Sequence, residues 1–238
     1  MFHTLFYEPV YNLIVIVLTI VPLHDIGTAI VIVTLIVKGL LLPLNLSALR
    51  TQYMMKRIEP DMKKIKELQK KDPQKASQDM VALYRKEKIN PFSSLFAMIL
   101  QIPVFFALYF VFSKGLHPDP QSLYSFISFP ETLHTHAFGL FDVTQKNIIL
   151  AGMAGISSFF LARRQTAGMG EVKENKEESF QDHFMKSMRI QMLYILPLII
   201  SFSAAFLPAA LALYWFVSNV ASYGLDVYMK NKLAHLKK

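Results

Sequence analysis

The sequence contains no cysteine and a single tryptophan among its 238 residues. The absence of cysteine excludes disulfides, thiolate catalysis and metal sites with cysteine ligands. Acidic residues are also missing where the chain is most apolar, because its long hydrophobic stretches contain no Asp or Glu beyond their edges. A carboxylate-based proton relay or cation site within a membrane is therefore not expected.

Motifs of common enzyme classes are absent too. The sequence has no glycine-rich nucleotide loop, no metalloprotease helix motif and no nucleophile elbow. All seven histidines lie outside the hydrophobic stretches. His134 and His136 are close enough in sequence to share a metal, but a pair without a nearby third ligand is more often incidental. We therefore predict a protein that is not an enzyme and that uses no cofactor or metal.

Apolar residues make up 53% of the chain and occur in long blocks. A soluble protein has roughly 45–50% apolar residues, spread at helical or strand spacing. We therefore predict an all-α membrane protein with five transmembrane helices. The first is the shortest in its purely apolar part, and an interfacial position is its alternative. The expected spans are residues 7–23, 28–49, 91–112, 147–161 and 192–223.

Basic residues gather in three segments, because residues 50–88, 163–189 and 230–238 hold 22 of the 25 lysines and arginines. Cytoplasmic segments of membrane proteins carry such an excess. Placing all three in the cytoplasm puts the N-terminus outside and the C-terminus inside, with the bacterial inner (cytoplasmic) membrane as the location. The net charge of +8 then follows mainly from topology, and no specific nucleic-acid partner is expected.

The spans and basic segments divide the chain into four parts. In the second part, Asp72 and Pro73 are typical of a helix N-cap followed by the first helical residue. The external loop within the third part is expected to lie along the membrane face with a short interfacial helix. The parts are 1–49, the first two spans; 50–90, a cytoplasmic helical hairpin; 91–223, the third to fifth spans with an external loop at 114–146 and a cytoplasmic loop at 163–189; and 224–238, a basic cytoplasmic tail.

Lys38 is the charged residue inside the apolar run from Thr28 to Leu44. It lies about 15 Å into a helix that begins at Thr28, at about 1.5 Å per residue. An ionisable group at such a depth costs roughly 2.5–3.5 kcal/mol and indicates a functional site. The alternative is a lysine that reaches the headgroups from a tilted or short helix.

Four further polar or amphipathic residues of the spans are candidate site residues. Thr34 lies four residues before Lys38 and Asn45 lies seven after it, on one helical face. Gln101 in the third span, like Lys38, needs a partner or water in hydrocarbon, and a water-filled indentation would satisfy both. Trp215 in the fifth span has an interfacial position as its alternative. Most Ser and Thr hydroxyls of the spans are expected to bond back to their own helix.

Four blocks of the sequence resemble the YidC family of membrane protein insertases, relatives of the mitochondrial Oxa and chloroplast Albino proteins. They occur in the order found in the family, across essentially the whole chain, with a charged hairpin between the first two. The blocks are IVKGLLLPL at 36–44, MVALYRKEKINP at 80–91, LQIPVFFALY at 100–109 and LPAALALYWFVSN at 207–219.

The resemblance implies an insertase and chaperone with a groove that is open to the cytoplasm and to lipid and closed on the outer side. Hydrophilic tails of nascent membrane proteins would enter this groove while their apolar segments move into lipid. Lys38 stands where the family usually has a buried arginine, and Gln101 and Trp215 would line the same groove, with Thr34 and Asn45 as further members. The ribosome and a Sec-type translocon are candidate partners, beside the lipid bilayer.

Two other functions stay open at this point. One is a small transporter or channel for an anionic solute that binds Lys38, although the spans show no internal repeat or paired broken helices. The other is a scaffold subunit of a translocation complex, in which a partner's carboxylate pairs with Lys38. Lysine also differs from arginine because it can lose its proton when desolvated.

Overall fold

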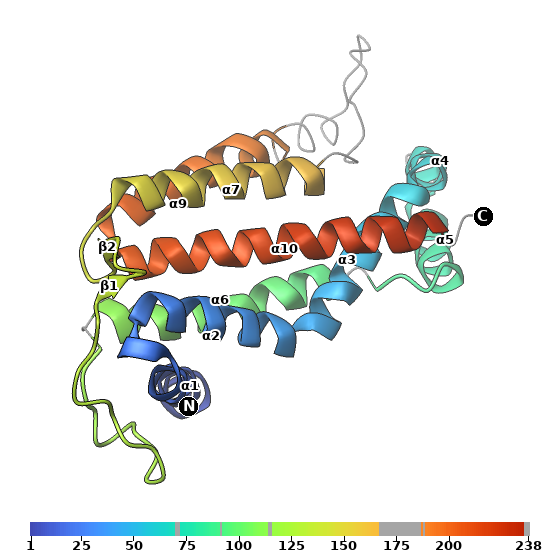
Figure 1. Cartoon of the computed structure of the whole chain (residues 1–238). Coiled ribbons are helices and arrows are strands. Elements are labelled where there is room, and N and C mark those ends of the chain that lie inside the picture. The colour runs from blue at the N-terminus through green and yellow to red at the C-terminus, as the bar shows by residue number, and fades with distance from the viewer. Residues whose placement is uncertain (70–71, 91, 114–115, 167–186, 188, 236–238) are drawn as a thin grey trace.

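The computed structural model describes residues 1–69, 72–90, 92–113, 116–166, 187 and 189–235. Helices make up nearly all the regular structure of these residues, which confirms the predicted all-α fold. Five helices lie side by side with their axes roughly aligned, some of them antiparallel to others (Figure 1). They are α2 (Ile26–Leu40), α6 (Ser93–Ser113), α7 (Ile148–Thr166), α9 (Leu196–Phe206) and α10 (Ala209–His235).

The bundle has two distinct ends (Figure 1). The end that we call the strand end carries β1 (His136–Ala137), β2 (Phe141–Asp142) and the rest of residues 116–147. The opposite end, which we call the basic end, carries the last turns of α10 and three further helices. These are α3 (Leu42–Arg57), α4 (Glu59–Gln69) and α5 (Pro73–Lys86). The described parts of the three basic segments thus lie at one end, as expected for segments on one side of a membrane.

The predicted first span is α1 (Glu8–Ile20), preceded by a π-helical turn at His3–Tyr7. By length and composition, His3–Ile20 is the described helix that qualifies alone as a membrane span, and the bent pair α2–α3 would be a second. In Figure 1, however, α1 is viewed end-on, whereas the five helices of the bundle are viewed from the side. The axis of α1 therefore lies across the axes of the bundle helices. The interfacial alternative for residues 7–23 accounts for this direction.

The predicted second span is broken rather than continuous. α2 ends at Leu40 and α3 begins at Leu42, with a bend of 65° between them. Pro43 explains the break, because it has no N–H to donate to the carbonyl of Gly39 one turn earlier.

The prediction of a single fifth span over residues 192–223 is wrong. α9 ends at Phe206, Leu207 is extended with φ −98° and ψ 162°, and α10 begins at Ala209. A residue that precedes proline is disfavoured in the helical conformation, and Pro208 follows Leu207. α10 then runs back along the bundle (Figure 1), so this part of the chain forms two antiparallel helices.

The helical hairpin after α3 has the expected cap and one unexpected break. Asp72 Oδ1 accepts a hydrogen bond from Lys75 N over 3.0 Å at the start of α5. A hairpin has two helices, but residues 50–90 contain the end of α3 as well as α4 and α5, because a break at Ile58 separates α3 from α4. Pro60 is the cause, because it cannot donate to the carbonyl of Lys56.

The short interfacial helix predicted for the external loop is absent from residues 116–147, which form turns and a two-stranded ribbon. In the ribbon His136 pairs with Asp142. Phe138 and Gly139 at its turn have φ of 53° and 70°, the left-handed values that tight hairpin turns require. Gly27 at the start of α2 packs against this ribbon so closely that an added Cβ would lie 2.1 Å from the Ala137 Cβ.

Two hydrophobic clusters form the core, and α10 belongs to both. The larger joins α1, α2, α6 and α10 around side chains that are almost fully buried, among them Ile14, Leu18, Ile30, Val111 and Leu211. The smaller joins α7, α9 and α10 through Leu150, Ala151, Ala204, Ala209 and Ala212. Small side chains allow helices to approach closely, so α10 is the helix that connects the two halves of the bundle.

Candidate functional site

Four polar side chains follow one another along α10, and we call them the α10 stripe: Tyr214, Ser218, Ser222 and Asp226. They are four residues apart, so they lie on one face of the helix. Tyr214, Ser218 and Asp226 are buried, and Ser222 is partly buried. Buried polar groups need hydrogen-bond partners, and Tyr214, Ser222 and Asp226 have partners on other helices.

Lys38 on α2 is the partner of Ser222. Its Nζ donates a hydrogen bond to Ser222 Oγ over 3.0 Å and thereby joins α2 to α10. Lys38 is half-buried, and its ammonium forms no ion pair with any carboxylate in the part of the chain that the structure describes. An ammonium has three N–H donors, so Lys38 can bind a further acceptor without releasing Ser222.

Gln101 on α6 is the partner of Tyr214 at the other end of the stripe. Its Nε2 donates to Tyr214 Oη, and the tyrosine is only 2% exposed. Eight residues separate Tyr214 from Ser222, which corresponds to about 12 Å along the helix axis. Gln101 and Lys38, both predicted from the sequence, are therefore joined to the same face of α10.

Asp226 binds two helices at once at the basic end. Tyr53 on α3 donates its Oη to Asp226 Oδ1 over 2.9 Å, and Arg164 on α7 donates its Nε to Asp226 Oδ2. The side chain of Asp226 is 4% exposed and that of Arg164 is 24% exposed. The guanidinium of Arg164 also lies over the ring of Tyr223, 4.9 Å from its centroid.

A different face of α10 is joined to α7. Asn219 Nδ2 donates to Ser158 Oγ over 2.7 Å and to Ser157 Oγ over 3.1 Å. With Arg164 and Asn219 together, α10 has polar contacts to α7 as well as to α2, α3 and α6.

Thr34 and Trp215 have contacts other than the stripe. Thr34 is buried, and its hydroxyl donates back to the carbonyl of Ile30 over 2.6 Å on its own helix. Trp215 stacks on Phe105 of α6, with ring centroids 5.0 Å apart and an interplanar angle of 17°. Both side chains contribute to packing between helices, and their place in a groove stays a prediction.

Asn45 lies on α3, beyond the bend. Because α2 and α3 meet at 65°, a spacing of seven residues does not place Asn45 on the helical face of Lys38. Its Nδ2 is buried and has no hydrogen-bond partner among the described residues. Asn45 thus has an unused donor, but the structure does not join it to the stripe.

Sequence reasoning missed Tyr53, Arg164, Ser222 and Asp226. The four-residue period that begins at Tyr214 is the signal that would have found Ser222 and Asp226. Asp226 lies beyond residue 223, where the last span was expected to end. Tyr53 and Arg164 lie in segments that were expected to be outside the spans.

The groove itself also stays a prediction. Among the described residues, a pocket of about 590 Å³ lies on α5, away from the stripe, and is lined by Ser77, Gln78, Val81, Ala82 and Arg85.

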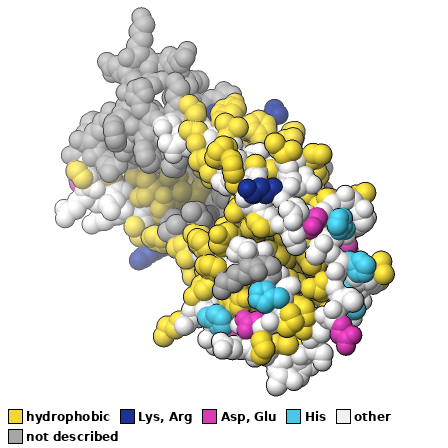
Figure 2. All heavy atoms as spheres, turned by 90° about the vertical axis from the view of Figure 1, so that its left-hand side faces the viewer, with side chains coloured by type: hydrophobic (Ala, Val, Ile, Leu, Met, Phe, Trp, Pro, Cys, Tyr) yellow, Lys and Arg dark blue, Asp and Glu magenta, His cyan; other side chains and the backbone are white. Residues whose placement is uncertain are grey.

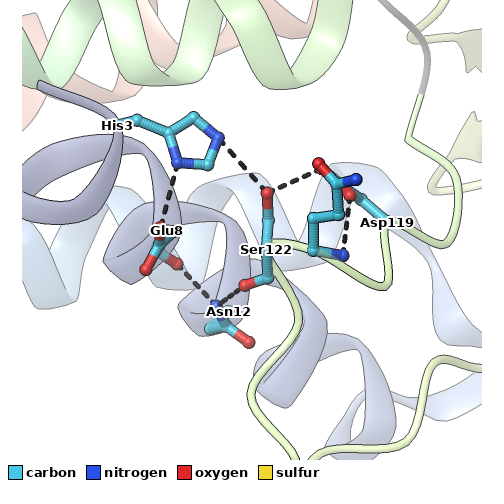
Figure 3. A network of polar contacts seen from close by, with 6 residues as sticks. His3, Glu8, Asn12, Asp119 and Ser122 are labelled. Atoms are coloured by element: carbon cyan, nitrogen blue, oxygen red, sulfur yellow. Dashed lines mark hydrogen bonds and ion pairs between the residues drawn. The ribbon is translucent and has the colours of Figure 1, made fainter.

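At the strand end, side chains of α1 bind the backbone of residues 116–147 (Figure 3). Asn12 Nδ2 donates to Ser122 O over 2.7 Å, and Asn12 Oδ1 accepts from Tyr124 N over 2.8 Å. Ser122 Oγ donates to Asp119 over 2.6 Å and lies 3.4 Å from His3 Nε2. The hydrogen bond from Ser122 lowers the pKa of Asp119 below its ordinary value.

α2 and α10 bind the same segment. Asp25, the N-cap of α2, accepts from Thr28 N over 2.5 Å and from Phe138 N over 2.9 Å. Ala209 N and Ala210 N at the start of α10 donate to backbone carbonyls of residues 145 and 143, over 2.8 and 2.9 Å. Residues 116–147 are therefore fixed to three helices at once.

The helices of the bundle are apolar and have hydrophobic side chains that face outward. Their buried polar groups meet along one central helix, α10. This combination is typical of a helical membrane protein. A family model described as 60Kd inner membrane protein matches residues 10–236 of the chain. The chain belongs to this family, that of the YidC membrane protein insertases.

Three relatives that carry the name membrane protein insertase YidC illustrate the similarity. The protein of Clostridium tetani is 31% identical over 209 residues, which cover 88% of this chain and 83% of that protein. The protein of Oceanobacillus iheyensis is 31% identical over 201 residues, 82% of this chain and 70% of the relative. The longer protein of Burkholderia cenocepacia is 31% identical over 214 residues, 89% of this chain and 34% of the relative. The match confirms the family resemblance, and the family is one of insertases and not of enzymes.

Proposed function

We propose that this protein is an insertase and chaperone of the bacterial inner membrane that receives the hydrophilic tails of nascent membrane proteins beside Lys38. Membership of a family whose relatives are named membrane protein insertases supports the general activity. One structural observation carries the role of Lys38. Its ammonium is bonded to the neutral hydroxyl of Ser222, and it is not neutralised by a described carboxylate.

The proposed topology has five membrane-crossing helices, namely α2, α6, α7, α9 and α10. The basic end lies in the cytoplasm and the strand end lies outside, with α1 along the outer interface. Figure 2 supports this orientation, because the strand end shows histidine and carboxylate side chains among hydrophobic ones and few lysines or arginines. Cytoplasmic surfaces of membrane proteins show the opposite bias. The N-terminus is then outside and the C-terminus inside.

Client capture begins with electrostatic attraction. A client tail enters from the basic end, and one of its carboxylates accepts hydrogen bonds from the unused N–H groups of Lys38. The dielectric constant of this site is lower than that of bulk water, so the electrostatic attraction is stronger. The client's apolar segment remains at the surface of α6 and α10, where exposed side chains such as Ile102, Phe106 and Val220 face outward. Burial of that segment in lipid then supplies the driving force.

The strand end would resist the passage of the tail until the apolar segment has entered the lipid. Residues 116–147 are bound there to α1, α2 and α10 through backbone groups. The basic segments at the basic end are the candidate contacts for the ribosome. A Sec-type translocon is a further proposed partner.

The test is insertion by the purified protein in liposomes. The client is a single-span protein with an acidic N-terminal tail, and insertion is scored by protection of the tail from added protease. We expect insertion by the wild type and a large loss with Lys38→Ala. Lys146→Ala removes a lysine at the strand end and serves as the matched control.

The two parts of the proposal fail differently in this assay. Equal insertion by the wild type and Lys38→Ala would keep the insertase and reject the role of the cation. Absence of insertion by the wild type, together with flux of an anionic solute in the same liposomes, would reject the insertase in favour of a transporter.

A further inference from the structure

Two basic side chains from different helices lie along the α10 stripe, and only one of them has a carboxylate partner among the described residues. Lys38 is bonded to Ser222, a neutral residue. Arg164 is paired with Asp226. Asp226 therefore neutralises one of the two cations that contact the stripe and leaves the other without a described carboxylate partner.

The positions of the two cations make this difference important for a client. Asp226 follows Ser222 by four residues, about 6 Å along the helix axis. It lies on the side of the basic end, where α10 finishes (Figure 1). A tail that enters from that end, as the proposed function requires, passes Arg164 before it reaches Lys38.

The geometry around Asp226 is well suited to holding an arginine in place. One carboxylate oxygen accepts from Tyr53, which fixes the orientation of the group, and the other accepts from Arg164. Asp226 is almost completely shielded from solvent, whereas Arg164 retains partial exposure. The ring of Tyr223 covers one face of the guanidinium. Without Asp226, an arginine with a permanent charge would face the incoming tail.

We propose that Asp226 is a positioning residue that determines where acidic tails bind: it neutralises Arg164, so that an incoming carboxylate is captured by Lys38. The inference rests on the proposed function, because it takes acidic client tails as the ligand. In this proposal Arg164 can bind an anion, but it does not do so while it is paired with Asp226.

Peptide binding tests this inference without requiring insertion. The probe is a fluorescently labelled synthetic peptide rich in Asp and Glu, and its counterpart carries Asn and Gln at the same positions. Binding to the full chain in phosphatidylcholine nanodiscs is measured by fluorescence anisotropy at low and high salt. The variants are Lys38→Gln, Arg164→Gln, Asp226→Asn and the double variant of Arg164→Gln with Asp226→Asn.

We expect Asp226→Asn to bind the acidic peptide several-fold more tightly than the wild type, with no change for the amide peptide. The gain should disappear at high salt and in the double variant, because both depend on the charge of Arg164. Arg164→Gln alone leaves the carboxylate of Asp226 without its cation, so it should produce no gain and should weaken binding less than Lys38→Gln does. A structural role of Asp226 alone would not produce a gain that depends on peptide charge.

Two controls keep the result interpretable. Asp61→Asn removes one negative charge from an exposed pair with Lys64, whose atoms are 3.8 Å apart, and should leave binding unchanged. Asp226→Ser removes the carboxylate with a smaller side chain and should reproduce the gain of Asp226→Asn, provided that both variants keep the helical content and melting temperature of a folded protein.

The inference is overturned if neither neutral variant of Asp226 raises acidic-peptide binding, or if the gain persists in the double variant. It is also overturned if Arg164→Gln weakens wild-type binding as much as Lys38→Gln does. Failure of the proposed function would give a different result, because Lys38→Gln would then bind the acidic peptide and insert the client as well as the wild type does. The comparison of Asp226→Asn with its double variant would still show whether Arg164 can bind the acidic peptide.

Discussion

At the strand end, residues 116–147 are held mainly through main-chain atoms, whereas Lys38 and Arg164 join α2 and α7 to α10 through contacts between side chains. Asn12 and Asp25 bind backbone groups of that segment, and the start of α10 donates two backbone N–H groups to it. The contacts of Lys38 and Arg164, in contrast, each join one side chain to another.

The difference has a physical consequence for what each end can do. A buried backbone group that loses its partner carries the full cost of desolvation, so opening the strand end would be costly. A partly exposed side chain such as Lys38 or Ser222 can exchange one partner for another at little net cost, because the incoming group restores the hydrogen bond. We therefore expect substitutions at the strand end to lower stability and substitutions at the basic end to alter client handling.

Asn12→Ala should break the strand end most strongly. It leaves the N–H of Tyr124 and the carbonyl of Ser122 without their partner. At about 1–3 kcal/mol for each of the two unsatisfied groups, we expect a loss of roughly 2–6 kcal/mol. Reversible unfolding in mixed micelles measures it, with Asn231→Ala on the exposed face of α10 as the control. A loss no larger than that of the control would show that the segment is held by other contacts.

Lys38→Glu should alter function and leave the fold intact. Reversing the charge converts an attraction of about 1–2 kcal/mol for an acidic tail into a repulsion of similar size. Because each 1.4 kcal/mol is a factor of ten, insertion of such a client should fall on the order of 100-fold.

The same variant should insert a client with a neutral tail nearly as well as the wild type, and its melting temperature should stay close to that of the wild type. Lys146→Glu is the matched charge reversal at the strand end. If Lys38→Glu lost stability instead of charge-selective insertion, the proposed division between the two ends would not hold.

Tyr214→Phe probes the end of the stripe that is farther from the basic end. It removes the acceptor of Gln101 Nε2, and we expect a stability loss of about 1–2 kcal/mol. Adding Gln101→Leu should recover part of the loss, because it removes the unsatisfied donor as well. Tyr194→Phe changes a tyrosine that is 53% exposed and is the control. Strictly additive losses in the double variant would contradict a direct contact.

Ser122→Ala should have the smallest effect, a change in one titration at the strand end. The hydroxyl of Ser122 holds the pKa of Asp119 below its ordinary value, so its removal should raise this pKa. A lowered folded-state pKa means that the carboxylate contributes stability above pH about 4 and that this contribution is lost as the pH falls through the folded-state value. The carboxyl carbon shift of Asp119 in an NMR titration reports the change, and an unchanged pKa would refute it.

The sequence was informative where a residue conflicts with its own surroundings. Lys38 and Gln101 are polar groups inside apolar runs, which was enough to predict that each has a partner or water. Asp72 followed by proline was enough to predict the start of α5, and the cap has the expected hydrogen bond.

Long-range relations were not predictable in the same way. Prolines are tolerated inside membrane helices, so Pro103, which lies within α6, could not be distinguished beforehand from Pro208, which separates α9 from α10. The partners of the stripe come from four helices, and the pairing of Arg164 with Asp226 joins residues 62 positions apart. Such pairings depend on the packing of whole helices, which the pattern within one helix does not specify.

The order in which the chain is synthesised gives the central position of α10 another meaning. α10 leaves the ribosome after α2, α3, α6 and α7, yet it supplies the hydrogen-bond partners of side chains on those earlier helices: Lys38, Tyr53, Gln101 and Arg164. Until it arrives, each of these polar side chains must rely on water, lipid headgroups or another protein. A chain truncated before α10 would therefore hold several unpaired polar groups within the membrane, and would itself resemble an unfinished client.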